Sequence, residues 1–233
     1  MKKFLAIALS ALMLVGLFGL VACNKPEDDG VMTHAEYIAA EIDSDVVIEA
    51  YVQGHQSWWD NKITVYAQDK DGAYFMYEMA CSEEDSAKLT KGTKIRVTGT
   101  KTAWEGEVEI VDATFEIIEG DTWTATATDV TDLLANETEL IKHQNELVSF
   151  KGLEIAGIEY KNGEPGDDIY VTVKKGDASY SFCVEVYLTG TDSDVYTTVG
   201  TLKVGDIVDI EAFLYWYGSA NPHITAIAPV TAE

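Results

Sequence analysis

The sequence has few basic residues. It holds 16 Lys and Arg against 40 Asp and Glu, which gives a formal net charge of −24, and Arg96 is its only arginine. A chain this acidic repels phosphate backbones and anionic headgroups at long range. We therefore expect nucleic acid, heparin-like polymers and anionic lipid headgroups to be disfavoured partners.

Sequence motifs for catalysis and metal binding are also missing. There is no GxSxG, no HExxH, no CxxC and no glycine-rich phosphate loop leading into a helix. The four histidines are scattered among expected helices and loops, at His34, His55, His143 and His223. We expect no catalytic residue, no metal site and no cofactor, and we do not expect an enzyme.

The N-terminus has the pattern of an export signal. Lys2 and Lys3 are followed by a run, residues 4–22, that contains no charged side chain. An apolar run of ~18 residues could also cross a bilayer as a helix, so the end of the run decides between the two interpretations. It ends in the tetrapeptide Leu-Val-Ala-Cys at residues 20–23.

This tetrapeptide resembles the lipobox of bacterial lipoproteins. The resemblance implies that a signal peptide, residues 1–22, is cleaved before Cys23. It also implies that lipid, palmitate included, is attached to the Cys23 thiol, and that the acyl chains hold the protein at the outer face of the cell membrane. Residues 23–31 are mostly polar and turn-forming, and we expect them to form a lipidated tether.

Two cysteines remain once Cys23 is assigned to lipid. Cys81 and Cys183 lie about 100 residues apart, in different halves of the chain. Free cysteine behaves as a small apolar residue. We expect two half-buried, unpaired thiols.

From Asp45 onward, apolar and polar residues alternate with a period of two, which predicts short antiparallel strands. The segment Asp69 to Gly72 predicts a hairpin turn with glycine in a left-handed conformation. A three-residue loop keeps one face apolar by pairing Ala67 with Phe75, Val65 with Tyr77, and Ile63 with Met79. A helix capped by Ser82 and two further strands, 94–101 and 107–118, complete the unit.

The second half repeats this order of three strands, a helix and two strands. A shift of 113 residues superposes Leu89 on Leu202 and Gly92 on Gly205, and keeps the apolar positions between them in step. Upstream the shift falls to about 102, which fits insertions at residues 163–168 and 189–194. Helices are expected before each copy, at 33–41 and 132–144. A duplicated unit is the simplest account.

This order, with the LxxGxxIxV stretch at 89–97 and its counterpart at 202–210, resembles the OB-fold, a five-stranded partly open barrel. The resemblance implies an all-β protein of two tandem OB-fold-like barrels with short helices. The domains would span 32–118 and 132–233, with a linker at 119–131. A pair of unrelated small β-barrels or sandwiches is the alternative.

Aromatic residues supply the candidate ligand site. In OB-folds, the loops between strands one and two and between strands four and five flank the ligand face. The first loop carries Trp58 and Trp59, the second carries Trp104, and Tyr66 and Tyr74 are expected on the outer strand face. Five such rings could stack sugar rings, bases or a proline-rich peptide. The alternative is that they seal the barrel ends or pack one domain on the other.

The sequence therefore predicts a non-catalytic, lipid-anchored binding protein of the cell envelope, with an oligosaccharide or a peptide as its ligand. One alternative is a structural or assembly subunit that binds another envelope protein. Another, by analogy with the OB-fold, is single-stranded nucleic-acid binding. That function needs a basic groove beside the stacking residues, and the sequence offers little for one.

Overall fold

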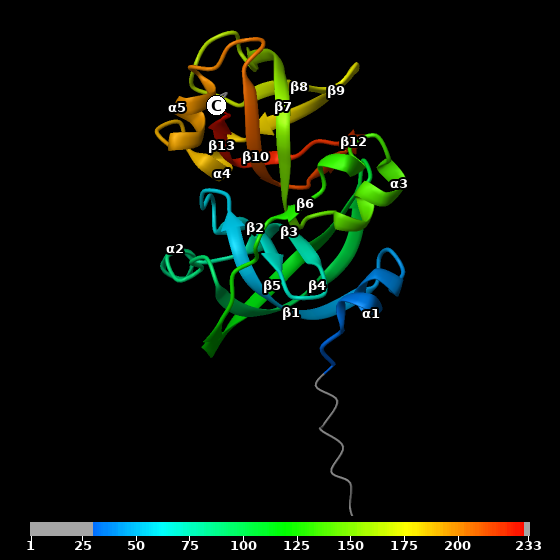
Figure 1. Ribbon diagram of the computed structural model, residues 1–233. Coiled ribbons are helices and arrows are strands. Elements are labelled where there is room, and N and C mark those ends of the chain that lie inside the picture. The colour runs from blue at the N-terminus through cyan, green and yellow to red at the C-terminus, as the bar shows by residue number, and fades with distance from the viewer. Residues whose placement is uncertain (1–29, 231–233) are drawn as a thin grey trace, which may run out of the picture.

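The computed structural model describes residues 30–230, which form two β-barrels in series (Figure 1). The predicted signal peptide, Cys23 and most of the predicted tether lie outside the described residues. Within residues 30–230, no helix is long and apolar enough to cross a membrane. The prediction of an all-β fold with two OB-fold-like barrels is confirmed.

The first barrel is a closed sheet with the strand order β1-β2-β3-β5-β4, the order of an OB-fold. Its helices are one or two turns long and lie outside the sheet. The elements are α1 (His34–Ala39), β1 (Asp45–His55), β2 (Lys62–Gln68), β3 (Ala73–Ala80), α2 (Glu83–Ser86), β4 (Thr93–Trp104) and β5 (Glu107–Thr122).

The second barrel has the sheet order β10-β13-β9-β8-β7, with β6 added beside β7, and β10 closes the ring by pairing with β7 as well. Its strands are β6 (Thr128–Asp129), β7 (Leu147–Tyr160), β8 (Ile169–Lys175), β9 (Ala178–Val184), β10 (Ile207–Phe213) and β13 (His223–Pro229). The other elements are η1 (Thr131–Leu133), α3 (Glu137–Leu140), η2 (Ile141–His143), α4 (Val186–Thr189), α5 (Asp194–Val199) and the small hairpin β11 (Trp216–Tyr217) and β12 (Ser219–Ala220).

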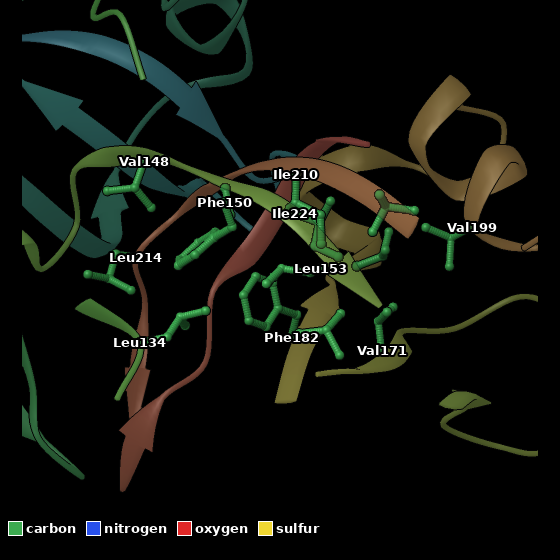
Figure 2. Packing of buried hydrophobic residues seen from close by; sticks show 14 of the residues in the cluster. Leu134, Val148, Phe150, Leu153, Val171, Phe182, Val199, Ile210, Leu214 and Ile224 are labelled. Atoms are coloured by element: carbon green, nitrogen blue, oxygen red, sulfur yellow. The ribbon is translucent and has the colours of Figure 1, made fainter. Parts of the chain in front are cut away.

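Each barrel has its own hydrophobic core, built from the inward residues of its alternating strands. In the second barrel, Phe150 and Phe182 meet edge to face with ring centroids 4.8 Å apart. Aliphatic side chains from β7, β8, β10 and β13 surround them (Figure 2). Two cores of this kind explain why the repeat is visible in the apolar pattern although few residues are identical.

Two features confirm the internal repeat. The third and fifth strands of each barrel meet in one parallel pair, Met76 with Ile110 in the first barrel and Cys183 with His223 in the second. Ile110 and His223 stand at the predicted spacing of 113 residues.

The glycines before the fourth strand are the second feature. Gly92 and Gly205 have φ angles of +92° and +95°. Their N–H groups donate to the carbonyl oxygens of Val52 at 2.7 Å and Ile155 at 2.8 Å, at equivalent places on the first strand. Only glycine adopts this backbone conformation without steric cost, so both copies need it.

The register between β2 and β3 corrects part of the prediction. The pairs are Ala67 with Tyr74, Val65 with Met76, and Ile63 with Met79, and only the last matches. A bulge between Ile63 and Val65, opposite Glu78 with its φ of +48°, shifts the register by one residue. Such a shift exchanges the two faces of the strand. Tyr74 and Met76 therefore point into the core, and Phe75 points outward.

Gly72 is needed for a different reason than the one predicted. It is not among the residues with positive φ. A Cβ atom at this position would lie 2.2 Å from the His34 ring, so the glycine allows α1 to approach the hairpin. The turn itself is held by Asp69 Oδ1, which accepts from the N–H groups of Asp71 and Gly72.

The boundary between the barrels also differs from the prediction. β5 continues to Thr122, and β6 already pairs with β7, so the segment between the two sheets spans only residues 123–127. The helix expected at 132–144 is broken into η1, α3 and η2. Asn136 caps α3 in the middle of that range, where its side chain accepts from the Glu139 N–H.

The two remaining cysteines are unpaired, as predicted. Cys81 and Cys183 are 5% and 4% exposed, so both are more buried than the prediction had them. Burial in the low dielectric raises the pKa of the Cys183 thiol to about 12. Neither thiol has the exposed, electropositive surroundings of a reactive cysteine.

Candidate functional site: an aromatic pocket at the junction of the barrels

Two of the five aromatic residues predicted to bind ligand are buried. Tyr66 and Tyr74 are both 0% exposed. The register shift turns Tyr74 into the first core, where its hydroxyl donates to Asp69 Oδ2 at 3.0 Å. Tyr66 lies against the second barrel. The prediction that these two tyrosines form an exposed ligand surface is wrong.

Tyr66 belongs to an aromatic contact between the barrels. Its ring stacks on Phe213 of β10, with centroids 4.3 Å apart and an angle of 8° between the planes. Its hydroxyl and His223 Nδ1 form a hydrogen bond of 2.9 Å. Burial lowers the pKa of His223 to about 4, so the ring is neutral and Nδ1 can accept. The strand face that binds ligands in OB-folds is therefore covered here by the second barrel.

Trp104 is 60% exposed on the β4–β5 turn. This turn is joined to the second barrel, because the Gly218 N–H donates to the Glu105 carbonyl oxygen at 2.6 Å. Tyr217, the equivalent of Trp104 in the second copy, is exposed as well. Trp104 does not line the pocket that holds Trp58 and Trp59. Its predicted ligand contact stays a prediction.

Trp58 and Trp59 line a pocket of about 340 Å³ between the β1–β2 loop and α4 of the second barrel. Trp59 is 79% exposed, and Tyr187 of α4, which also lines the pocket, is 63% exposed. The other lining residues are Gln56, Ser57, Lys62, Ile63, Thr64 and Glu78. The pocket thus combines flat aromatic faces with hydroxyl, amide and charged groups. We call it the junction pocket.

A tight turn presents the two tryptophans. Trp59 and Lys62 exchange two backbone hydrogen bonds, of 3.0 and 2.9 Å. Asp60 and Asn61 between them have φ angles of +46° and +61°, and two left-handed residues in succession are the mark of a type I′ turn. Asp and Asn tolerate this conformation better than other side chains do. The sequence Trp-Asp-Asn-Lys therefore builds a rigid support for an exposed ring.

Trp58 is held more firmly than Trp59. Its indole Nε1–H donates to the Cys81 carbonyl oxygen at 2.9 Å, and its ring packs on the first core. The indole is half-buried, so only part of it reaches the junction pocket. We therefore expect Trp58 to orient a ligand and Trp59 to cover it.

Contacts between the barrels position Tyr187. The Ser57 N–H donates to the Tyr187 carbonyl oxygen at 2.7 Å, and Gln56 Nε2 donates to Glu185 Oε2 at 3.1 Å. Glu185 in turn caps α4, because its Oε1 accepts from the Tyr187 N–H. Burial, with Asp168 nearby, raises the pKa of Glu185 to about 7.

Sequence reasoning missed the second barrel's share of the junction pocket. Ser57 and Tyr187 are 130 residues apart in the chain, and no periodicity links them. The one available signal is the insertion at 189–194, which begins two residues after Tyr187 in the repeat alignment.

The charges of the junction pocket are balanced. Lys62 Nζ donates to Glu78 Oε2 at 2.6 Å, and this hydrogen bond raises the pKa of Lys62. Both side chains are about half exposed. An ion pair of this kind offers N–H donors and carboxylate acceptors side by side while adding no net charge. Within residues 30–230, no group of three or more His, Cys, Asp or Glu could hold a metal ion.

The chain was compared with protein families, with curated proteins and with solved structures. No family model and no curated protein matches it. Solved structures that match include a murine DNA-binding protein bound to double-stranded DNA, with 10% identity, a TM-score of 0.37, and coverage of 80% of this chain and 96% of that one.

Two further solved structures also match at low sequence identity. The Ifi202 HINa domain in complex with 20-bp double-stranded DNA has 12% identity and a TM-score of 0.34, with 81% of this chain and 100% of that chain covered. Asparaginyl-tRNA synthetase from Pyrococcus horikoshii has 14% identity and a TM-score of 0.30. That match covers 38% of this chain, which spans 20% of the synthetase's length.

Proposed function

We propose that the protein is a non-catalytic binding protein that holds a neutral, hydroxyl-rich ligand, an oligosaccharide, in the junction pocket. The observation that carries this proposal is the exposure of Trp59 and Tyr187 around a pocket lined by polar groups. At 79% exposure, the Trp59 indole contributes little to the packing of residues 30–230. The rigid turn beneath Trp59 and the contacts that fix Tyr187 support a site built for a ligand.

The chemistry of the junction pocket favours a sugar. A pyranose has apolar C–H faces that pack on aromatic rings and hydroxyl groups that both donate and accept. The Lys62–Glu78 pair, the Gln56 amide and the Thr64 hydroxyl supply partners of both kinds. A phosphate-bearing ligand would meet one cation whose charge Glu78 already offsets, within a chain of net charge −24.

Binding assays with paired variants test this proposal. We expect Trp59→Ala and Tyr187→Ala each to weaken oligosaccharide binding at least tenfold in titration calorimetry against a glycan panel. Trp104→Ala is the matched control, since it removes an exposed tryptophan outside the junction pocket. Equal loss in all three variants, or no loss in the first two, would contradict the proposal.

Single-stranded nucleic-acid binding is a second candidate, and a feature of the second barrel favours it. In OB-folds the face of strands two and three binds ligands. The corresponding face of β8 and β9 is open in the second barrel, with Tyr170, Thr172, Lys174 and Ser181 exposed. Single strands are bound by stacking aromatic residues within a basic groove, and Tyr170 and Lys174 supply one residue of each kind. Retention of an oligonucleotide at low salt, abolished by Tyr170→Ala but not by Trp59→Ala, would favour this function.

We further propose that a lipid on Cys23 anchors the protein to the outer face of the cell membrane. The support is the sequence that precedes and includes this cysteine, a basic start and an apolar run that ends in Leu-Val-Ala-Cys. Metabolic labelling with a palmitate analogue should mark the protein, and Cys23→Ser should abolish the label. Labelling that survives this change would contradict the anchor.

A further inference from the structure

A second groove lies on the first barrel. It measures about 970 Å³ and runs between the end of β3, the short helix α2 and the second half of β5. Ala80 and Asp85 line one side, and Phe115, Ile117 and Glu119 line the other. In Figure 1, α2 protrudes from the side of the first barrel. None of the residues that line the junction pocket lines this groove.

The two copies of the repeat differ at this place. In the second barrel, α5 packs against β13, and its Tyr196 and Val199 are buried in the core. In the first barrel, α2 has a single turn, buries no residue and makes no comparable contact with β5, the equivalent of β13. Phe115 and Ile117 are therefore only partly buried. The groove is a place that the second copy covers with a helix and the first copy leaves open.

The floor of the groove is a strand edge. β5 pairs with β4 along its whole length, from Glu107 to Thr122. On its other side, among the described residues, β5 pairs with β3 at Ile110 alone. The backbone groups from Ala113 onward therefore have no strand partner on that side. An edge of this kind is a template for one more strand.

The charge around the groove is negative. Lys88 Nζ is paired with Glu84 at 3.2 Å and Asp85 at 2.8 Å. Within residues 30–230, Glu119 on the opposite side has no ion-pair partner, and Glu116 and Asp121 on the same strand are exposed. Among the described residues, the only cationic residue that lines the groove, Lys88, is thus already paired with carboxylates, whereas the Glu119 carboxylate is available to pair with a cationic ligand.

We propose that this groove binds an extended polypeptide segment that carries cationic side chains, which adds a strand to the free edge of β5. Backbone hydrogen bonds to β5 supply affinity. Phe115 and Ile117 take the apolar side chains of the segment, and Glu119 takes a lysine or arginine. An extended backbone is the one ligand whose donors and acceptors repeat with the spacing of a strand edge. This site is separate from the junction pocket, and either could exist without the other.

A synthetic peptide of alternating lysine and valine, capped at both ends, is the probe. We expect the full protein to bind it in fluorescence anisotropy and not to bind the matched peptide of alternating glutamate and valine. Ala80→Phe, which fills the groove, and Glu119→Lys, which reverses the charge, should each weaken binding at least tenfold. Asp177→Lys, on the exposed β8–β9 turn, controls for the change of net charge, and thermal unfolding controls for folding.

A second measurement needs no variant. Alternate N–H groups of a strand point to opposite edges, so methylating one alternate set of peptide nitrogens blocks one edge only. Strand addition predicts that one of the two methylated isomers binds as the parent peptide does and that the other does not bind. Equal binding of both isomers, no binding of the parent peptide, or unchanged binding to the Ala80→Phe variant would overturn the proposal.

Discussion

Glu107 is a buried carboxyl group whose pKa the fold raises. It sits at the start of β5, 0% exposed, and its Oε2 accepts from the Trp216 N–H of the second barrel at 2.9 Å. Among the described residues, its Oε1 and Asn145 Oδ1 are buried oxygen atoms without a hydrogen-bond donor. When protonated, the Glu107 carboxyl group is itself a hydrogen-bond donor. Burial is the main cause that raises its pKa to about 8, and Glu109 nearby adds to it.

This raised pKa makes stability depend on pH in a definite direction. Below pH 4.5, which is the pKa of Glu107 in the unfolded chain, the carboxyl group is protonated in both states and does not change the free energy of unfolding. As the pH rises towards 8, the unfolded chain loses the proton and the folded chain must keep it, so the folded state loses relative stability. A shift from 4.5 to about 8 corresponds, at 1.36 kcal/mol per pKa unit, to roughly 4–5 kcal/mol.

Glu107→Gln is the perturbation that isolates this effect, because a glutamine amide donates where the protonated carboxyl does and cannot ionise. We expect the variant and the parent to unfold at similar urea concentrations at pH 4.5. At pH 8.5 the variant should be more stable by roughly 4–5 kcal/mol. Glu105→Gln, on the same turn but exposed, controls for the loss of one charge. A constant difference between parent and variant from pH 4.5 to 8.5 would show that Glu107 has no raised pKa in the folded state.

Three further predictions concern packing, and each is tested by measuring the free energy of unfolding in urea. Lys101 Nζ donates to three carbonyl oxygens at the end of α1, at 2.8 to 3.0 Å. Lys101→Met should therefore lower the free energy of unfolding by about 2–3 kcal/mol and make α1 accessible to proteases. Full retention of stability would contradict this. Gly72→Ala should cost about 1–3 kcal/mol through its clash with His34, and His34→Ala in the same chain should recover most of it. Phe213→Ala should cost about 3–5 kcal/mol, since it removes the ring stacked on Tyr66; two separate unfolding transitions in that variant would show that this contact couples the barrels.

Local patterns predicted the order of the elements well. The period-two alternation and the turn residues placed the long strands of each barrel, and Gly92 and Gly205 marked the same place in both copies. Ser82 placed α2, because an N-cap is a local signal that needs no tertiary contact: its hydroxyl oxygen accepts from the Asp85 N–H at 3.1 Å.

The faces of the strands could not be predicted in the same way. A single bulge opposite Glu78 reversed the assignment of Tyr74 and Phe75, and bulges leave little trace in a hydrophobic pattern. The burial of Tyr66 depends on Phe213 of the other barrel, which no local rule connects with it. Trp59 was found because two tryptophans in a polar loop are unusual, whereas Tyr187 joins it only through the way the barrels pack.

NMR spectroscopy can show whether the junction pocket binds an oligosaccharide. The measurement follows the indole N–H signals of the five tryptophans in a two-dimensional ¹H–¹⁵N spectrum while members of a glycan panel are titrated in. We expect one class of glycan to shift the signals of Trp58 and Trp59 together and to leave those of Trp104, Trp123 and Trp216 in place. If no glycan moves Trp58 and Trp59, or if a ligand moves only the signal of Trp104, the claim is contradicted.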